Sequence, residues 1–118
     1  MKVAWDPEAL QRDLRLRHPS VTIYLSGRKI DKDMRLLTLS MIRVPKDERG
    51  HGTGTEIMKH ILAYADVAQA FVALSPDGTF GTSAKRLRSW YKSLGFVDNK
   101  GRSRELRISE SMYREPRP

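Results

Sequence analysis

The chain contains no cysteine among its 118 residues. This absence excludes disulfide bonds, zinc sites built from thiolates and a cysteine nucleophile. His18 and His60 have no second metal ligand at a helpful spacing, so we expect no metal. A chain without cysteine suits the reducing cytoplasm, which is the expected location.

Long hydrophobic runs are also missing. Hydrophobic residues make up 39% of the chain and charged residues 31%, as in ordinary globular proteins, and no apolar run approaches the length of a transmembrane helix. The segment Met1–Pro7 reaches an acid and a proline before the apolar part of a signal peptide could form. We therefore expect no membrane association and a single domain over residues 1–118.

Acidic residues are the minority among the charged ones. The chain has 22 lysines and arginines against 14 aspartates and glutamates, which gives a formal net charge of +8. Such a surface attracts polyanions, which include nucleic acid, acidic proteins and polyphosphate cofactors. Charge alone does not choose among these partners, nor does it exclude a role in solubility only.

Hydrophobic spacing and turn residues predict a mixed α/β order of elements. Asp6 and Pro7 are typical of a helix start, and Pro19 ends that helix. The remaining predicted elements are strands over 21–25, 36–44 and 70–74, helices over 55–68 and 84–94, and a two-stranded finish of 96–97 and 106–113 around a turn at 98–101. Residues 28–35 are expected to form a polar connection.

Three glycines, Gly50, Gly52 and Gly54, stand between a predicted strand and a predicted helix. Glycine lets consecutive backbone N–H groups approach an anion, and the following helix adds its own free amides and the positive end of its dipole. The spacing fits neither the Walker loop nor the dinucleotide fingerprint. The loop therefore predicts a pyrophosphate site of another kind.

Two segments resemble the GNAT superfamily of N-acetyltransferases. The loop Arg49–Gly54 is similar to that family's Arg/Gln-x-x-Gly-x-Gly/Ala signature, and Leu87–Phe96 is similar to its later helix with a tyrosine followed by Gly-Phe. The similarity covers roughly residues 36–97. It implies a single-domain GNAT-like α+β fold, with a mixed central sheet that splays at the coenzyme A site and helices on its faces. It also implies an enzyme that moves an acetyl group from acetyl-CoA to an amine.

The resemblance assigns roles to individual residues. Backbone groups of Ile42, Arg43 and Val44 would contact the pantetheine arm. Ser83 would either contact the pantetheine or simply cap its helix, and Tyr91 would protonate the departing thiolate. The pyrophosphate would be held by Arg49, Gly50, His51, Gly52, Thr53, Gly54 and Thr55, with the backbone of His51 more important than its ring.

These roles also make chemical sense without the family. When an amine attacks a thioester, a backbone N–H near Met41 or Ile42 can stabilise the oxyanion, and a phenol near the sulfur can supply the proton that the thiolate needs. No covalent enzyme intermediate is required, in agreement with the missing cysteine. Trp90, beside Tyr91, is expected to pack in the core.

The sequence departs from the family pattern at the general base. Family members often carry a carboxylate on the central strand, but residues 36–44 contain none. A lysine-like amine has a pKa of roughly 10.4, so its proton needs a route away. Four residues are candidates for removing this proton through a water molecule: Asp31, Asp33, Ser40 and Glu110. The N-terminal half is also short, so the acceptor site is open, unusual or completed by a second subunit in a homodimer.

The acceptor itself is not encoded in any motif. Lys85, Arg86, Arg88 and Lys92 surround the tyrosine helix and would form a solvated face, contact the 3′-phosphate of coenzyme A, or bind an acceptor carried on an acidic protein or RNA. Two other functions are kept as alternatives: a coenzyme A-binding interaction protein without catalysis, and a small basic nucleic-acid-binding module.

Overall fold

The computed structural model describes residues 5–76 and 83–118. Three α-helices occur in these ranges: α1 Pro7–Arg17, α2 Thr53–Ala68 and α3 Ala84–Ser93. The strands are β1 Thr22–Lys29, β2 Arg35–Arg43, β3 Ala70–Leu74, β4 Val97–Asp98 and β5 Met112–Arg114. The short 3₁₀ helices are η1 Lys46–Glu48 and η3 Gly101–Ser103. Within the described ranges, no helix is long and apolar enough to cross a bilayer.

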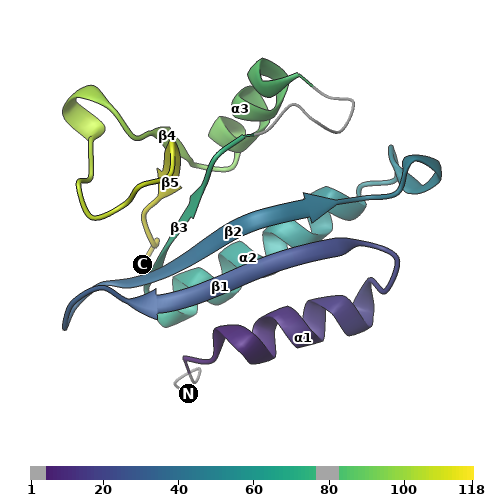
Figure 1. The fold of residues 1–118 in the computed structure, drawn as a ribbon, viewed down its shortest axis with the longest axis horizontal. Helices are drawn as coiled ribbons and strands as arrows, with labels where there is room; N and C mark the ends of the chain where they lie inside the picture. Colours follow the sequence, from purple (N-terminus) through teal and green to yellow (C-terminus); the bar gives the residue numbers. More distant parts are fainter. Residues whose placement is uncertain (1–4, 77–82) are drawn as a thin grey trace.

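The sheet is mixed, with its strands in the order β1-β2-β3-β5-β4. β2 and β3 are parallel, and the other neighbouring pairs are antiparallel. α2 is the crossover that a parallel pair needs. In Figure 1, β1 and β2 run side by side, while β3 leaves β2 at an angle toward β5 and β4. The expected α+β fold, a mixed central sheet with flanking helices, is confirmed.

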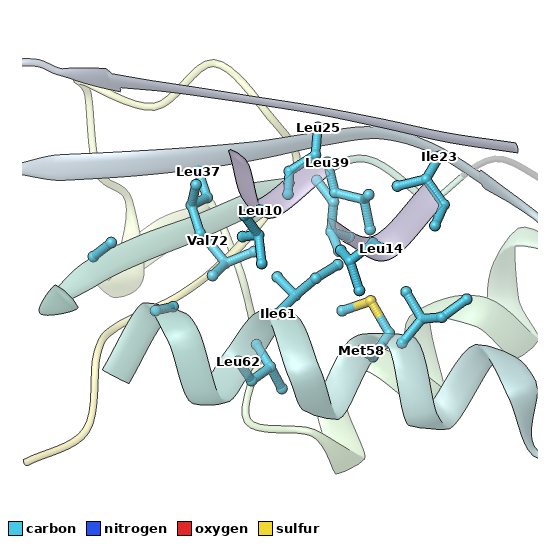
Figure 2. Packing of buried hydrophobic residues seen from close by; sticks show 14 of the residues in the cluster. Leu10, Leu14, Ile23, Leu25, Leu37, Leu39, Met58, Ile61, Leu62 and Val72 are labelled. Atoms are coloured by element: carbon cyan, nitrogen blue, oxygen red, sulfur yellow. The ribbon is translucent and has the colours of Figure 1, made fainter. Parts of the chain in front are cut away.

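The main core lies between one face of the sheet and the helices α1 and α2. Leu10 and Leu14 of α1 point into it one helical turn apart. α2 buries a stripe at helical spacing, made of Ile57, Met58, Ile61, Leu62, Ala65 and Ala68. Figure 2 shows Leu10 and Leu14 of α1, and Met58 and Ile61 of α2, facing the leucines and the isoleucine of β1 and β2. This packing holds the start of α2 beside the end of β2.

β1 is an edge strand, and α1 covers its open edge. The Leu25 amide donates to the Gln11 side chain at 2.8 Å, and the Arg15 guanidinium donates to the Ile23 carbonyl at 2.8 and 3.0 Å. Gly27 is needed beside the helix start, because a Cβ there would lie 2.2 Å from Cγ of Pro7. Two backbone groups that would otherwise be free to pair with another chain are thus satisfied.

The structure corrects several predicted boundaries. β1 continues to Lys29, so the polar connection is shorter than predicted, and α2 begins at Thr53 rather than at Thr55. β2 ends at Arg43, one residue before Val44. The sequence also predicts a turn over 75–78, and Thr82 as an alternative to Ser83 for the cap of α3; the turn lies partly, and Thr82 wholly, outside the described residues.

The largest correction concerns the predicted strand 106–113, which is reduced to β5. The side chain of Asn99 replaces the missing strand pairing: its amide donates to the carbonyls of Ile108 and Glu110, and its oxygen accepts from the Glu105 amide. Residues 99–111 therefore form a folded connection rather than half of a hairpin. Ile108 packs from this connection into a second apolar cluster on the other face of the sheet.

Arg114 joins the end of β5 to two helices. Its side chain is 4% exposed and donates two hydrogen bonds to the Asp66 carboxylate, at 2.8 and 3.1 Å, and one to the Leu94 carbonyl. These hydrogen bonds lower the pKa of Asp66 below its ordinary value. The C-terminal strand is thereby fixed to the end of α2 and the end of α3.

Candidate active site

An opening forms where β2 and β3 separate. Their parallel pairing ends at Leu39 and Leu74, four residues before β2 itself ends. At the same point the register with β1 shifts, since Tyr24 pairs with Met41 and Leu25 with Leu39, so that Ser40 has no partner. This irregularity is a β-bulge, a feature that bends a strand and ends pairing. On the side that faces β3, residues 40–43 of β2 therefore border an opening, while residues 41–43 remain paired with β1 on the other side.

A cleft of about 240 Å³ occupies this opening. It extends from the bulge and the end of β3, through the unpaired part of β2, to the start of α2 and one side of α3. Its lining residues are Leu39, Ser40, Met41, Ile42, Arg43, Val44, Arg49, Gly54, Leu74, Ser75, Leu87, Trp90 and Tyr91. The cleft thus joins a strand edge to two helices from distant parts of the sequence.

The start of α2 forms a second hollow next to the cleft. Gly50 and Gly52 have φ angles of +84° and +79°, and a Cβ on either would meet nothing within 4 Å. Gly52 is the N-cap and has no side chain to bond the first amides, so those of Thr53, Gly54 and Thr55 have no acceptor within the helix. The three residues that carry these amides line the hollow, together with Val44, Glu48, Arg49, Gly50, Gly52 and Trp90. Free amides and the positive end of the helix dipole favour an anion there.

Arg49 stands where the two hollows meet and lines both. Its Nε donates to the Val44 carbonyl at 3.0 Å, which orients the guanidinium beside the glycine loop. The same contact uses one of the two lone pairs of the Val44 carbonyl oxygen, so this oxygen can accept a further hydrogen bond.

Tyr91 is fixed at the cleft by other aromatic rings. Its side chain is 5% exposed, and its ring lies 5.0 Å from that of Trp90 and 5.6 Å, edge-on, from that of Phe96. Burial raises the pKa of the Tyr91 hydroxyl above its ordinary value of 10.0. The phenol is therefore protonated at neutral pH and can act as a proton donor.

The predicted cation cluster on α3 divides into two parts. Arg88 and Lys92 face Asp98 of β4, at 3.5 and 3.1 Å, and the hydrogen bond from Lys92 is the main cause that lowers the pKa of Asp98. Among the described residues, no ion-pair partner is found for Lys85 or Arg86, which are exposed in the first turn of α3. The paired cations anchor α3, and the unpaired ones leave positive charge at its start.

Only one of the four predicted proton-removal residues borders the cleft, and this is Ser40. Asp31 and Asp33 lie in the β1–β2 turn, and six residue steps along the chain, at about 3.3 Å each, separate Asp33 from Leu39 at the near end of the cleft, a distance of roughly 20 Å. Asp31 is paired there with Arg107 at 2.8 Å. The Glu110 carboxylate accepts from the Ser109 hydroxyl and lines neither hollow.

The structure brings together the residues predicted for cofactor binding and catalysis, with two exceptions. All of them line one or both hollows except His51, which is exposed, and Ser83. The Ser83 hydroxyl accepts from the Arg86 amide at 3.1 Å, which is the helix-capping role that the sequence also allowed. In the part of the chain that the structure describes, no group of three or more potential metal ligands is found.

Sequence reasoning missed Trp90 as a residue of the site. It is half-buried and packs against the core, as predicted, but it also lines both hollows. Consecutive side chains on a helix point about 100° apart, so the residue directly before Tyr91 can border the same cleft. This position next to Tyr91 is the sequence signal that could have identified Trp90.

No protein-family model and no curated protein matches the chain. Among solved structures, Arabidopsis thaliana Naa50, in complex with the bisubstrate analogue CoA-Ac-MVNAL, is similar with a TM-score of 0.55 and 15% identity over 80% of this chain. This chain spans 61% of the length of the Naa50 chain. Ard1 from Thermoplasma volcanium has a TM-score of 0.49 and 18% identity, with 98% of this chain and 84% of the other covered. The likeness to Naa50 shows a GNAT-like fold.

Proposed function

We propose that the protein is an N-acetyltransferase that moves the acetyl group of acetyl-CoA to an amine. One observation carries the proposal: a continuous path leads from the start of α2, past the part of β2 that has separated from β3, to the buried residue Tyr91. An elongated ligand with a pyrophosphate at one end and a reactive group beyond it matches this path. The Naa50 structure, which holds a coenzyme A-containing analogue, supports the proposal.

The residues of the glycine loop fit the pyrophosphate. Gly50 and Gly52 leave open space where side chains would stand, and the first three amides of α2 supply donors. Arg49 adds a fixed positive charge at the junction of the two hollows. Lys85 and Arg86 provide further positive charge for the 3′-phosphate of the cofactor or for an anionic acceptor.

The strand pairing favours Ile42 over Met41 as the oxyanion donor. Ile23 and Leu25 direct backbone groups outward to α1, so Ile23 and its partner Ile42 form a pair without mutual hydrogen bonds. In such a pair each residue points its backbone groups away from the other strand. The Ile42 amide therefore points toward the opening, where it can stabilise negative charge that develops on the acetyl carbonyl oxygen.

Bound acetyl-CoA supplies an activated acetyl thioester. Tyr91, protonated at neutral pH, gives the proton to the sulfur as the carbon–sulfur bond breaks. The amine must lose a proton in the same reaction, and Ser40 is the candidate that lines the acceptor end of the cleft. A serine hydroxyl would act there as a relay to water rather than as a base. We propose further that the acceptor is carried on an acidic partner.

Calorimetric titration with coenzyme A, followed by turnover assays, tests this function. The amines to be assayed are small polyamines, peptides with free α- or ε-amines, and aminoacyl-tRNA. Micromolar binding together with acetyl transfer to one class is the expected result. Binding without transfer to any class would favour the interaction protein, and no binding would overturn the proposal. Retention of the basic chain on nucleic acid in that last case would favour the nucleic-acid-binding module.

A further inference from the structure

Trp90 connects the two hollows. The cleft and the hollow at the start of α2 share four lining residues: Val44, Arg49, Gly54 and Trp90. Two of these present apolar side chains, and Arg49 is turned toward the Val44 carbonyl. The passage between the hollows therefore has two kinds of lining. Arg49 supplies positive charge next to the hollow at the start of α2, and Trp90 and Val44 form an apolar wall.

The position of the indole is fixed from two sides. A Cβ on Gly54 would lie 3.9 Å from Cη2 of Trp90, so the far edge of the indole reaches the first turn of α2. The ring is also 5.0 Å from that of Tyr91. Trp90 thus extends along the path from the helix amides to the residue proposed as the proton donor. It is only half-buried, which leaves part of its surface for a ligand.

We propose, on the basis of the proposed function, that Trp90 is a positioning residue that packs against the pantoyl group of coenzyme A. In that cofactor the second carbon after the pyrophosphate linkage bears two methyl groups, and no other part of the arm is as apolar. A pyrophosphate on the α2 amides brings these methyl groups to the passage that Trp90 and Val44 line. Their contact with the indole fixes where the arm leaves the phosphates and stabilises the bound cofactor.

Kinetics of Trp90→Leu and Trp90→Phe test the positioning role. We expect KM for acetyl-CoA to rise about tenfold in Trp90→Leu, since burial of two methyl groups accounts for roughly that factor. The value of kcat at saturation should change little, and Trp90→Phe should recover much of the affinity. 3′-Phospho-ADP, which has the pyrophosphate and no pantoyl group, should bind Trp90→Leu and the parent equally.

Fluorescence gives a readout that does not depend on turnover. The chain has two tryptophans, so Trp5→Phe leaves Trp90 as the sole indole; Trp5 packs on Tyr64, outside both hollows. Coenzyme A should change the emission of Trp5→Phe more strongly than 3′-phospho-ADP does. The matched control, Trp90→Phe with Trp5 retained, should show little change with either ligand.

The outcomes separate this inference from the proposed function. If calorimetry detects coenzyme A binding but Trp90→Leu binds it as tightly as the parent and the Trp90 emission is unchanged, the inference is wrong and the function stands. Equal losses for coenzyme A and 3′-phospho-ADP in a folded Trp90→Leu would assign Trp90 to the shape of the α2 hollow and would also overturn the inference. If the parent protein does not bind coenzyme A, both the inference about Trp90 and the proposed function are wrong.

Discussion

Tyr91 owes its chemical character to its surroundings. Burial is the only resolved cause of its raised pKa, and two aromatic neighbours fix the direction of its ring. The raised pKa makes the phenol a weak acid, so it stays protonated at neutral pH and gives up its proton only while negative charge develops on the sulfur. The residue is therefore suited to act late in the reaction, when charge accumulates on sulfur.

Replacement of Tyr91 by phenylalanine tests this role. Tyr91→Phe keeps the ring and its packing and removes the proton, so kcat should fall by about 10²- to 10⁴-fold, as is typical for loss of a general acid. Affinity for coenzyme A and thermal stability should remain near those of the parent. Parent-like turnover, with the chemical step rate-limiting, would mean that the thiolate takes its proton from water or from the substrate.

The pH profile follows from the same pKa. Because Tyr91 must be protonated to act and its pKa is raised above 10.0, its deprotonation should reduce kcat only above about pH 10. The ascending limb at lower pH should instead follow deprotonation of the acceptor amine. A fall in kcat between pH 7 and 9 with every acceptor would contradict a phenol in this role.

At the scale of single residues, the sequence is informative where a motif exists. Tyr91 and the glycine loop stand in recognisable patterns, and the structure brings both to the same cleft. Trp90 has no pattern of its own, because a half-buried indole at helical spacing is equally typical of a core. Only its distance to Gly54, which is 36 residues earlier in the chain, places it between the hollows.

The loop before α2 offers a test at the scale of an element. Gly52→Glu should abolish coenzyme A binding, because the carboxylate would enter the hollow that the α2 amides line. The substitution also carries backbone strain of about 1 to 2 kcal/mol, since Gly52 has a φ of +79°. Calorimetry measures the affinity, and urea unfolding measures the strain.

Gly101 provides the matched control. It also has a positive φ, +59°, and a Cβ there would meet nothing within 4 Å, but it lies in η3 and lines neither hollow. Gly101→Glu should lose about as much stability as Gly52→Glu and keep its affinity for coenzyme A. Equal affinities for the two folded variants would refute the assignment of the loop.

Strongly periodic elements are predictable from the sequence, and irregular ones are not. The predictions for α1, α2, β3 and α3 lie within a few residues of the structure because their apolar residues repeat at regular spacing and capping residues mark their ends. The bulge at Ser40 has no local signal, since it depends on the register with β1. The prediction of a strand within the connection 99–111 is wrong because the fold there depends on hydrogen bonds from the single side chain of Asn99.

At the scale of the whole molecule, the Asp66–Arg114 pair links segments 48 residues apart. Asp66→Asn would leave a guanidinium that is 4% exposed without its counter-ion, and we expect a loss of roughly 3 kcal/mol in unfolding free energy at pH 7. Asp13→Asn, which removes an exposed i,i+4 pair with Arg17, should cost less than about 1 kcal/mol. Urea titrations measure both values.

Acid should reduce the difference in unfolding free energy between the parent protein and Asp66→Asn. The pKa of Asp66 is lowered from 3.8 in the folded state, so its stabilising effect is complete above that value and is lost as the pH falls through the folded-state pKa. The difference in unfolding free energy between the two proteins should therefore shrink as the pH falls below 3.8. A difference that stayed constant from pH 7 to pH 2 would mean that the carboxylate charge is not what stabilises the pair.

The net charge of +8 concerns the molecule as a whole. If the acceptor is carried on an acidic partner, kcat/KM for that acceptor should fall several-fold between low ionic strength and about 1 M salt, where charges are screened beyond roughly 3 Å. The assay is run with acetyl-CoA saturating at each salt concentration. A flat response would point to a small neutral amine as acceptor.

α1 contributes no side chain to either hollow, yet Gln11 and Arg15 occupy the outward amide and carbonyl groups of β1. A sheet with an open edge has no intrinsic size, because each added strand offers a new edge to the next. By engaging the Leu25 amide and the Ile23 carbonyl, α1 hinders the addition of another strand at the β1 edge. A chain that lost these two side chains would have a route to fibril growth that the intact helix denies it.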